Sequence, residues 1–296
     1  MYRLDRHLLF QIAKKLSLTD LLNFCSCNKE INRKLECSIW DYLINTLSEI
    51  NDKSDQLLQD KKKYYILLYN LNQIKNILKL PGNLNVIYTI EELHIINVVN
   101  IFPRELCRLR NLKTLNLSGN QIQKIPREIY LLENLVTLNL SMNMIQKIPE
   151  EINQLKNLRN LYLSNNLIKE IPSIFPPNLQ YLHLAYNDIS TIPETIWNLY
   201  SLLVLRLENN KIKQLKLPNI ALTNLNKLDI HNNQIEELII LYLSELEELN
   251  IKGNPINKIE IGVLPNLKCL SLDNKQIRKM DAKSVSYYKI VMQNYY

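Results

Sequence analysis

The chain has 296 residues, a hydrophobic content of 46% and a formal net charge of +7. With 4 glycines it is neither collagen-like nor linker-like, and no apolar run is long enough to cross a membrane. The length allows one or two domains with a large core. Because the first residues lack the apolar segment of a secretion signal, we expect an intracellular protein, cytoplasmic or nuclear.

The five cysteines form an odd, scattered set and do not suggest a disulfide framework. The positive charge is spread over lysines that alternate with glutamates, and the compact basic run is Lys61 to Lys63. We therefore interpret the charge as a solvated surface and predict neither a nucleic-acid partner nor a membrane partner.

Residues 1–47 contain apolar residues at helical spacing, first around Leu8 and Ile12 and again around Leu21 and Leu22. A further helical segment carries Ile31, and Ile39-Trp40 begins another. Three or four short helices make a very small core, so this segment needs a partner or a neighbouring domain.

These residues resemble an F-box: the spacing of its leucines, of Asp20-Leu21-Leu22 and of Ile39-Trp40 is kept. Asp5 stands where that family has proline, and Cys27 where it has valine. The resemblance implies that the segment binds the adaptor protein of a cullin-RING ubiquitin ligase. Its adaptor-binding and core residues would be Leu8, Leu9, Ile12, Leu16, Leu21, Leu22 and Trp40. The alternative is that the helices only cap the domain that follows.

Residues 48–83 are interpreted as a polar linker followed by a capping helix. The helical pattern runs over 64–80 and ends at Pro81-Gly82.

Residues 84–285 are dominated by one repeated pattern. Residues 112–126 read LKTLNLSGNQIQKIP, and the skeleton LxxLxLxxNxIxxIP begins again at Leu135, Leu158, Leu179, Leu202, Leu225, Leu246 and Leu267. Its asparagines lie 23, 23, 21, 23, 23 and 21 residues apart, from Asn120 to Asn254. A period in the low twenties is typical of a solenoid, whose coils are stable only when stacked.

Each LxL is expected to form a short strand with its leucines inward. The asparagine that follows has one acceptor and two donors, so stacked asparagines would satisfy the buried turns of neighbouring coils. The pattern resembles the short, intracellular-type leucine-rich repeat. It implies an α/β solenoid with a short parallel sheet and atypical capping copies at both ends, where Val98 replaces the first asparagine and residues 286–296 seal the C-terminal end. Lys275 is expected to replace the last asparagine.

Outward strand positions of such a sheet would line a concave face. Large side chains gather in its middle, and we predict the target-binding residues Tyr162, Tyr181, His183, Tyr186, Arg206 and Asp229. Tyrosine and arginine dominate protein interfaces. The alternative is that the face is only a solvated sheet surface, on which the aromatic residues occur by chance.

No catalytic motif is present, and the four histidines are far apart in sequence. We therefore expect a protein that is not an enzyme and holds no cofactor or metal. The leading hypothesis is a substrate-recruiting subunit of a cullin-RING ubiquitin ligase, whose repeats hold an unknown protein target. The alternative is a leucine-rich repeat scaffold without a ubiquitin role.

Overall fold

A computed structural model describes residues 90–217 and 224–278 of the chain. All of them belong to a unit that spans residues 90–296. The predicted helical module of residues 1–47, the linker and capping helix of residues 48–83, and the C-terminal cap of residues 286–296 lie outside the described residues. Those three predictions therefore remain predictions.

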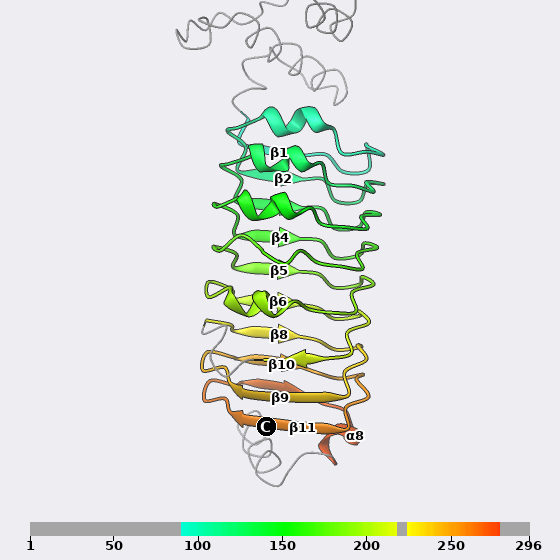
Figure 1. The fold of residues 1–296 in the computed structure, drawn as a ribbon, viewed down its shortest axis with the longest axis vertical. Coiled ribbons are helices and arrows are strands. Elements are labelled where there is room, and N and C mark those ends of the chain that lie inside the picture. Colours follow the sequence, from blue (N-terminus) through cyan, green and yellow to red (C-terminus); the bar gives the residue numbers. More distant parts are fainter. Residues whose placement is uncertain (1–89, 218–223, 279–296) are drawn as a thin grey trace, which may run out of the picture. The chain divides into compact units, whose positions relative to one another are not determined.

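The repeats form a solenoid around one parallel sheet of nine strands, in the order β1-β2-β3-β4-β5-β6-β8-β10-β12. Figure 1 shows these strands stacked along the long axis, each contributed by the next coil of the chain. Their bounds are β1 Glu92–His94, β2 Thr114–Asn116, β3 Thr137–Asn139, β4 Asn160–Tyr162, β5 Tyr181–His183, β6 Val204–Arg206, β8 Lys227–Asp229, β10 Glu248–Asn250 and β12 Cys269–Ser271.

The central leucine of each strand faces the core, as the alternating pattern predicts. Leu115, Leu138 and Leu161 are fully buried and pair in register from strand to strand. The residues on either side of each leucine point away from the core. We call the surface they form the concave face.

The asparagine ladder is present as predicted. Asn143 accepts a hydrogen bond from the Ile122 amide of the preceding coil at 3.0 Å. Its Nδ2 donates to the carbonyl of Leu117 in that coil at 2.9 Å and to that of Leu140 in its own coil at 3.0 Å. The same contacts recur at Asn166, Asn187, Asn210, Asn233 and Asn254. Each asparagine thus joins two coils, because a buried backbone group without a partner is costly.

The last position of the ladder differs from the prediction. Lys275 is exposed, and Gln276 takes the role of the asparagine. Gln276 is buried and donates from Nε2 to the carbonyls of Ile251 at 2.9 Å and Asn254 at 3.2 Å. It lies in the short helix α8, Asn274–Ile277, where its Oε1 also accepts from the Asp273 amide. The Ile251 carbonyl is the preceding-coil acceptor that a ladder asparagine would use, and the longer glutamine side chain reaches it from a helix.

The side of the solenoid opposite the nine-stranded sheet, which we call the convex side, begins with 3₁₀ helices. These are η1 Arg104–Arg108, η2 Arg127–Leu131, η3 Glu150–Gln154 and η4 Glu194–Asn198. A proline stands directly before each of them: Pro103, Pro126, Pro149 and Pro193. Proline has no amide donor and a fixed φ, so it favours the start of a helical turn.

A second parallel sheet occupies the convex side of the later coils, in the order β11-β9-β7. Its strands are β7 Leu215–Lys216, β9 Glu237–Tyr242 and β11 Lys258–Val263. The position of the earlier prolines, six residues after the ladder asparagine, is occupied here by Lys216, Ile239 and Glu260. These residues keep the amide, so neighbouring coils can pair as strands. Alternation of Leu238 and Ile240 in the core was the signal for this sheet, which the repeat pattern alone did not predict.

The residue before each ladder position has a positive φ between 52° and 68°. The turn therefore uses the left-handed conformation, which glycine and asparagine adopt most readily. These positions hold Asn97, Gly119, Met142, Asn165, Tyr186, Asn209, Asn232 and Gly253. Met142 and Tyr186 depart from that preference. We call the edge of the solenoid that these turns form the ladder edge.

Candidate functional site

The concave face brings most of the predicted target-binding residues together. Tyr162, His183, Arg206 and Asp229 occupy one row and are register neighbours on the adjacent strands β4, β5, β6 and β8. Tyr181 lies on β5 in the parallel row, opposite Asn160 and Val204. Tyr186 does not share this face. It lies in the following turn on the ladder edge with φ 54°, and its side chain is exposed.

The rings of Tyr162 and His183 pack edge to face, with their centroids 4.8 Å apart and an interplanar angle of 83°. Burial raises the pKa of Tyr162, with a smaller effect from Tyr181. Burial also lowers the pKa of His183 to about 4, and the cations Arg206 and Lys227 act in the same direction. His183 is therefore a neutral imidazole at neutral pH.

Asp229 is held in place by its neighbours. Its Oδ1 is 2.6 Å from His231 Nδ1 and accepts from the His231 amide at 3.2 Å, while Asn250 Nδ2 lies 3.4 Å from its Oδ2. Lys227 pairs with Glu248 on the next strand. The far half of the face thus carries a connected set of charged and amide side chains.

Sequence reasoning missed Glu208 as a member of this site. It belongs to the row formed by the residue after each LxL: Ser118, Ser141, Ser164, Ala185, Glu208, His231, Lys252 and Asp273. Aligning that position would have shown that small residues give way to a carboxylate at Glu208. The residue is 6% exposed, and burial is the main cause that raises the pKa of its carboxyl. A backbone hydrogen bond at Glu208 itself lowers this pKa, Asp229 raises it, and Arg206 lowers it by less than Asp229 raises it.

Three buried polar atoms without a hydrogen-bond partner lie in this part of the described structure: His183 Nε2, Arg206 Nε and Glu208 Oε2. Arg206 and Glu208 are only loosely paired, with Arg206 Nη1 3.9 Å from Glu208 Oε1. Most buried polar groups in proteins have a partner, so each exception requires an explanation. The centre of the concave face is therefore a polar site with unmet hydrogen-bonding capacity.

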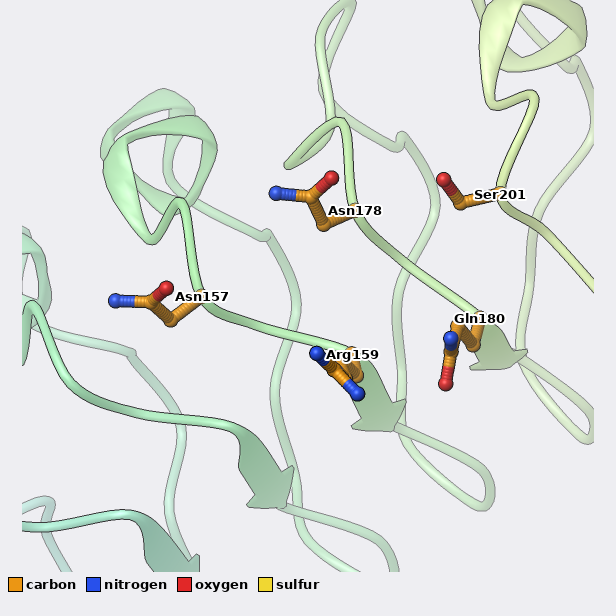
Figure 2. A pocket seen from close by; sticks show the side chains of 5 residues that line it. All are labelled: Asn157, Arg159, Asn178, Gln180 and Ser201. Atoms are coloured by element: carbon orange, nitrogen blue, oxygen red, sulfur yellow. The ribbon is translucent and has the colours of Figure 1, made fainter.

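A small depression lies at the edge opposite the ladder edge, with a volume of about 200 Å³. Figure 2 shows its lining side chains, Asn157, Asn178 and Ser201 at the same position in successive coils, with Arg159 and Gln180 nearer the strands. Asn157 and Asn178 each donate to a carbonyl of the preceding coil, at 2.9 and 2.8 Å. The depression lies where the shorter Ser201 takes the place of asparagine. The side-chain amides of Asn157 and Asn178 are used in hydrogen bonds that join neighbouring coils.

Within residues 90–217 and 224–278, no group of three or more His, Cys, Asp or Glu side chains could hold a metal ion. Cys107 is buried, and burial raises the pKa of its thiol to about 12, so it stays protonated. In the same residues we find no helix with the length and apolar character of a membrane span.

Two family models match the repeats: a leucine rich repeat model over residues 101–168 and a model of two leucine rich repeat copies over residues 177–219. Neither match includes residues 1–47. A comparison with curated proteins found no match.

Solved structures with this fold include a leucine-rich repeat protein of Leptospira interrogans. It is 35% identical over 60% of this chain and 46% of the Leptospira chain, with a TM-score of 0.53. The plant peptide hormone receptor RGFR1, solved in complex with RGF2, is 25% identical over 65% of this chain and 37% of the receptor chain, with a TM-score of 0.51. The chain thus spans less than half the length of either structure. From the ladder, the sheet and these matches, we conclude that the chain contains leucine-rich repeat domains, which build a curved solenoid with a parallel sheet.

Proposed function

We propose that this protein is a binding protein whose concave face holds a protein target, and that it recruits the target to a cullin-RING ubiquitin ligase. The observation that supports target binding is the row of Tyr162, His183, Arg206 and Asp229 on four adjacent strands. Aromatic and arginine side chains at the centre of a rigid sheet are the groups that contribute most to protein interfaces. The RGFR1–RGF2 complex shows that a related repeat domain takes a partner.

The ligase role rests on the sequence of residues 1–47. There the spacing of Leu8, Leu9, Ile12, Leu16, Leu21, Leu22 and Trp40 matches an F-box, which binds the adaptor of the ligase. In this proposal the chain performs no chemistry. It supplies proximity between a target and the enzymes of the ligase.

A second candidate function is a leucine-rich repeat scaffold without a ubiquitin role. The extent of the family matches favours it, since they cover parts of residues 101–219 and nothing before them. Residues 1–47 would then close the N-terminal end of the solenoid.

A pull-down with the purified ligase adaptor separates the two candidates. The full chain is expected to capture the adaptor, and Leu21→Asp with Leu22→Asp should abolish capture because two charges enter an apolar contact surface. Arg206→Ala is the control, since the concave face has no part in adaptor binding. Circular dichroism checks that the repeats of each variant remain folded. Equal capture by all three proteins, or by none, would contradict the ligase role.

A further inference from the structure

An apolar patch lies on the ladder edge beside the concave face. Met142 (63% exposed), Met144 (45%), Leu167 (45%) and Tyr186 (52%) come from three successive coils. The coils are joined here by backbone hydrogen bonds, from the Met142 amide to the Ser164 carbonyl at 2.8 Å and from the Asn166 amide to the Tyr186 carbonyl at 3.2 Å. The four side chains therefore lie in two neighbouring rows of one edge, with Asn165 between Met142 and Tyr186 in the row of turn residues.

Two members of the patch have an unfavourable backbone conformation. Met142 and Tyr186 have φ of 58° and 54°, at a position where the other coils carry asparagine or glycine. A bulky side chain in the left-handed region is strained, and such strain concentrates at functional sites. Neither side chain is buried, so packing within the solenoid does not offset the strain. The fold gives no reason for a methionine and a tyrosine here.

The patch ends at an acidic group with unmet hydrogen-bonding capacity. The Tyr186 amide donates to the Glu208 carbonyl of the next coil at 2.9 Å. Glu208 is buried, its Oε2 has no hydrogen-bond partner, and Arg206 approaches its other oxygen only to 3.9 Å. Asp229 on the following strand adds a second negative charge. A cation from a partner would complement this end of the patch, since charge-assisted hydrogen bonds are the strongest that a carboxylate accepts.

We propose that the target binds as an extended segment along the ladder edge. Apolar side chains of the target would contact Met142, Met144, Leu167 and Tyr186, and a lysine or arginine of the target would pair with Glu208. Adjacent coils are about 4.8 Å apart, and an extended chain advances about 3.3 Å per residue. The middle of the patch is two coils from Glu208, so the apolar and basic residues are separated by about three residues. The proposal requires the entering cation to replace Arg206 in its loose contact with Glu208 Oε1. The inference rests on the proposed function, because it specifies the target that the solenoid holds.

The test is selection of a displayed random dodecapeptide library on the immobilised full chain, followed by affinity measurements with a synthetic peptide of the consensus. We expect an apolar residue and a basic residue at the stated separation. Glu208→Gln should weaken this peptide about tenfold, the loss typical of an interface hot spot. Replacing the basic residue of the peptide by norleucine should cause the same loss and add nothing in Glu208→Gln.

The apolar half of the site has its own test. Met142→Asn with Tyr186→Asn should weaken the peptide about tenfold, yet raise the midpoint of thermal unfolding by about 2–4 °C because backbone strain is relieved. Ile174→Asn, which removes an exposed apolar side chain elsewhere in the same coils, should leave the affinity unchanged.

The possible outcomes separate this inference from the proposed function. Selected peptides that lose affinity in Tyr162→Ala or Arg206→Ala, but not in Glu208→Gln or in the Met142 and Tyr186 double variant, would overturn the inference and support a concave-face site. Failure to select any peptide on the wild-type chain would count against both.

Discussion

At the scale of single residues, His183 shows how burial on an open face changes the chemistry of a side chain. It lies against the Tyr162 ring, and burial together with Arg206 and Lys227 lowers its pKa to about 4. The unfolded chain keeps the ordinary pKa of 6.5. Between pH 6.5 and 4 the unfolded state therefore binds a proton that the native state does not.

We predict that this difference makes the protein less stable in mild acid. As the pH falls from 6.5 towards 4, the wild type should lose about 1–2 kcal/mol of stability relative to His183→Gln, after allowance for solvent at a partly exposed site. Urea unfolding of both proteins at pH 7, 5.5 and 4.5 measures this difference, and the comparison removes the effect of other groups such as Glu208. A difference that is constant with pH would contradict the prediction.

At the scale of elements, a proline six residues after the ladder asparagine excludes a convex strand, although it does not by itself ensure a 3₁₀ helix: none follows Pro172 in its coil, which the structure describes. Pro126 and Pro149 precede helices, whereas Ile239 occupies the equivalent position in β9. β9 is the central strand of the second sheet, between β7 and β11. The amide that proline lacks is the group that allows neighbouring coils to pair.

Ile239→Pro should therefore disrupt the second sheet. We expect a loss of ~3 kcal/mol in the free energy of unfolding, because a central strand tolerates neither the missing donor nor the ring. Ile239→Thr is the matched control: it keeps the amide and a β-branched side chain, and should cost less than about 1.5 kcal/mol. Chemical denaturation measures both. If the two variants were equally stable, the assignment of β9 as a paired strand would be wrong.

At the scale of the whole molecule, the solenoid is a one-dimensional stack. Each strand of the nine-stranded sheet pairs only with its neighbours in the order of the coils. Coupling between sites should therefore decay within a coil or two. Substitutions in a binding surface that extends from Met142 to Glu208 should then leave the stability of the C-terminal coils unchanged.

A double-mutant cycle tests this locality. Ile145, Ile168 and Ile256 occupy the same buried position in their coils. Ile145→Val with Ile168→Val, in successive coils, should depart from the sum of the single effects by ~0.5 kcal/mol or more. Ile145→Val with Ile256→Val should add within about 0.5 kcal/mol, since these sites share no neighbours. Each single change costs about 0.5–1.5 kcal/mol. Equal coupling for the near and distant pairs would contradict a nearest-neighbour stack.

The sequence alone determined the coil, its core and its ladder. The period, the inward leucines and the roles of Asn143 to Asn254 follow from alternation and hydrogen-bond accounting, which are local. It also located the row of Tyr162, His183, Arg206 and Asp229, because register in a regular stack is set by the repeat.

Only the tertiary structure decided what depends on contacts between coils. Gln276, and not the Lys275 that aligns with the ladder asparagines, donates to the Ile251 carbonyl, because a helix redirects the last side chain. The second convex sheet forms because three successive coils lack proline together. Tyr186 leaves the concave face because its backbone takes a positive φ in the turn. Glu208 becomes a buried carboxylate without a full set of partners through side chains of neighbouring coils, and no pattern within one repeat could show that.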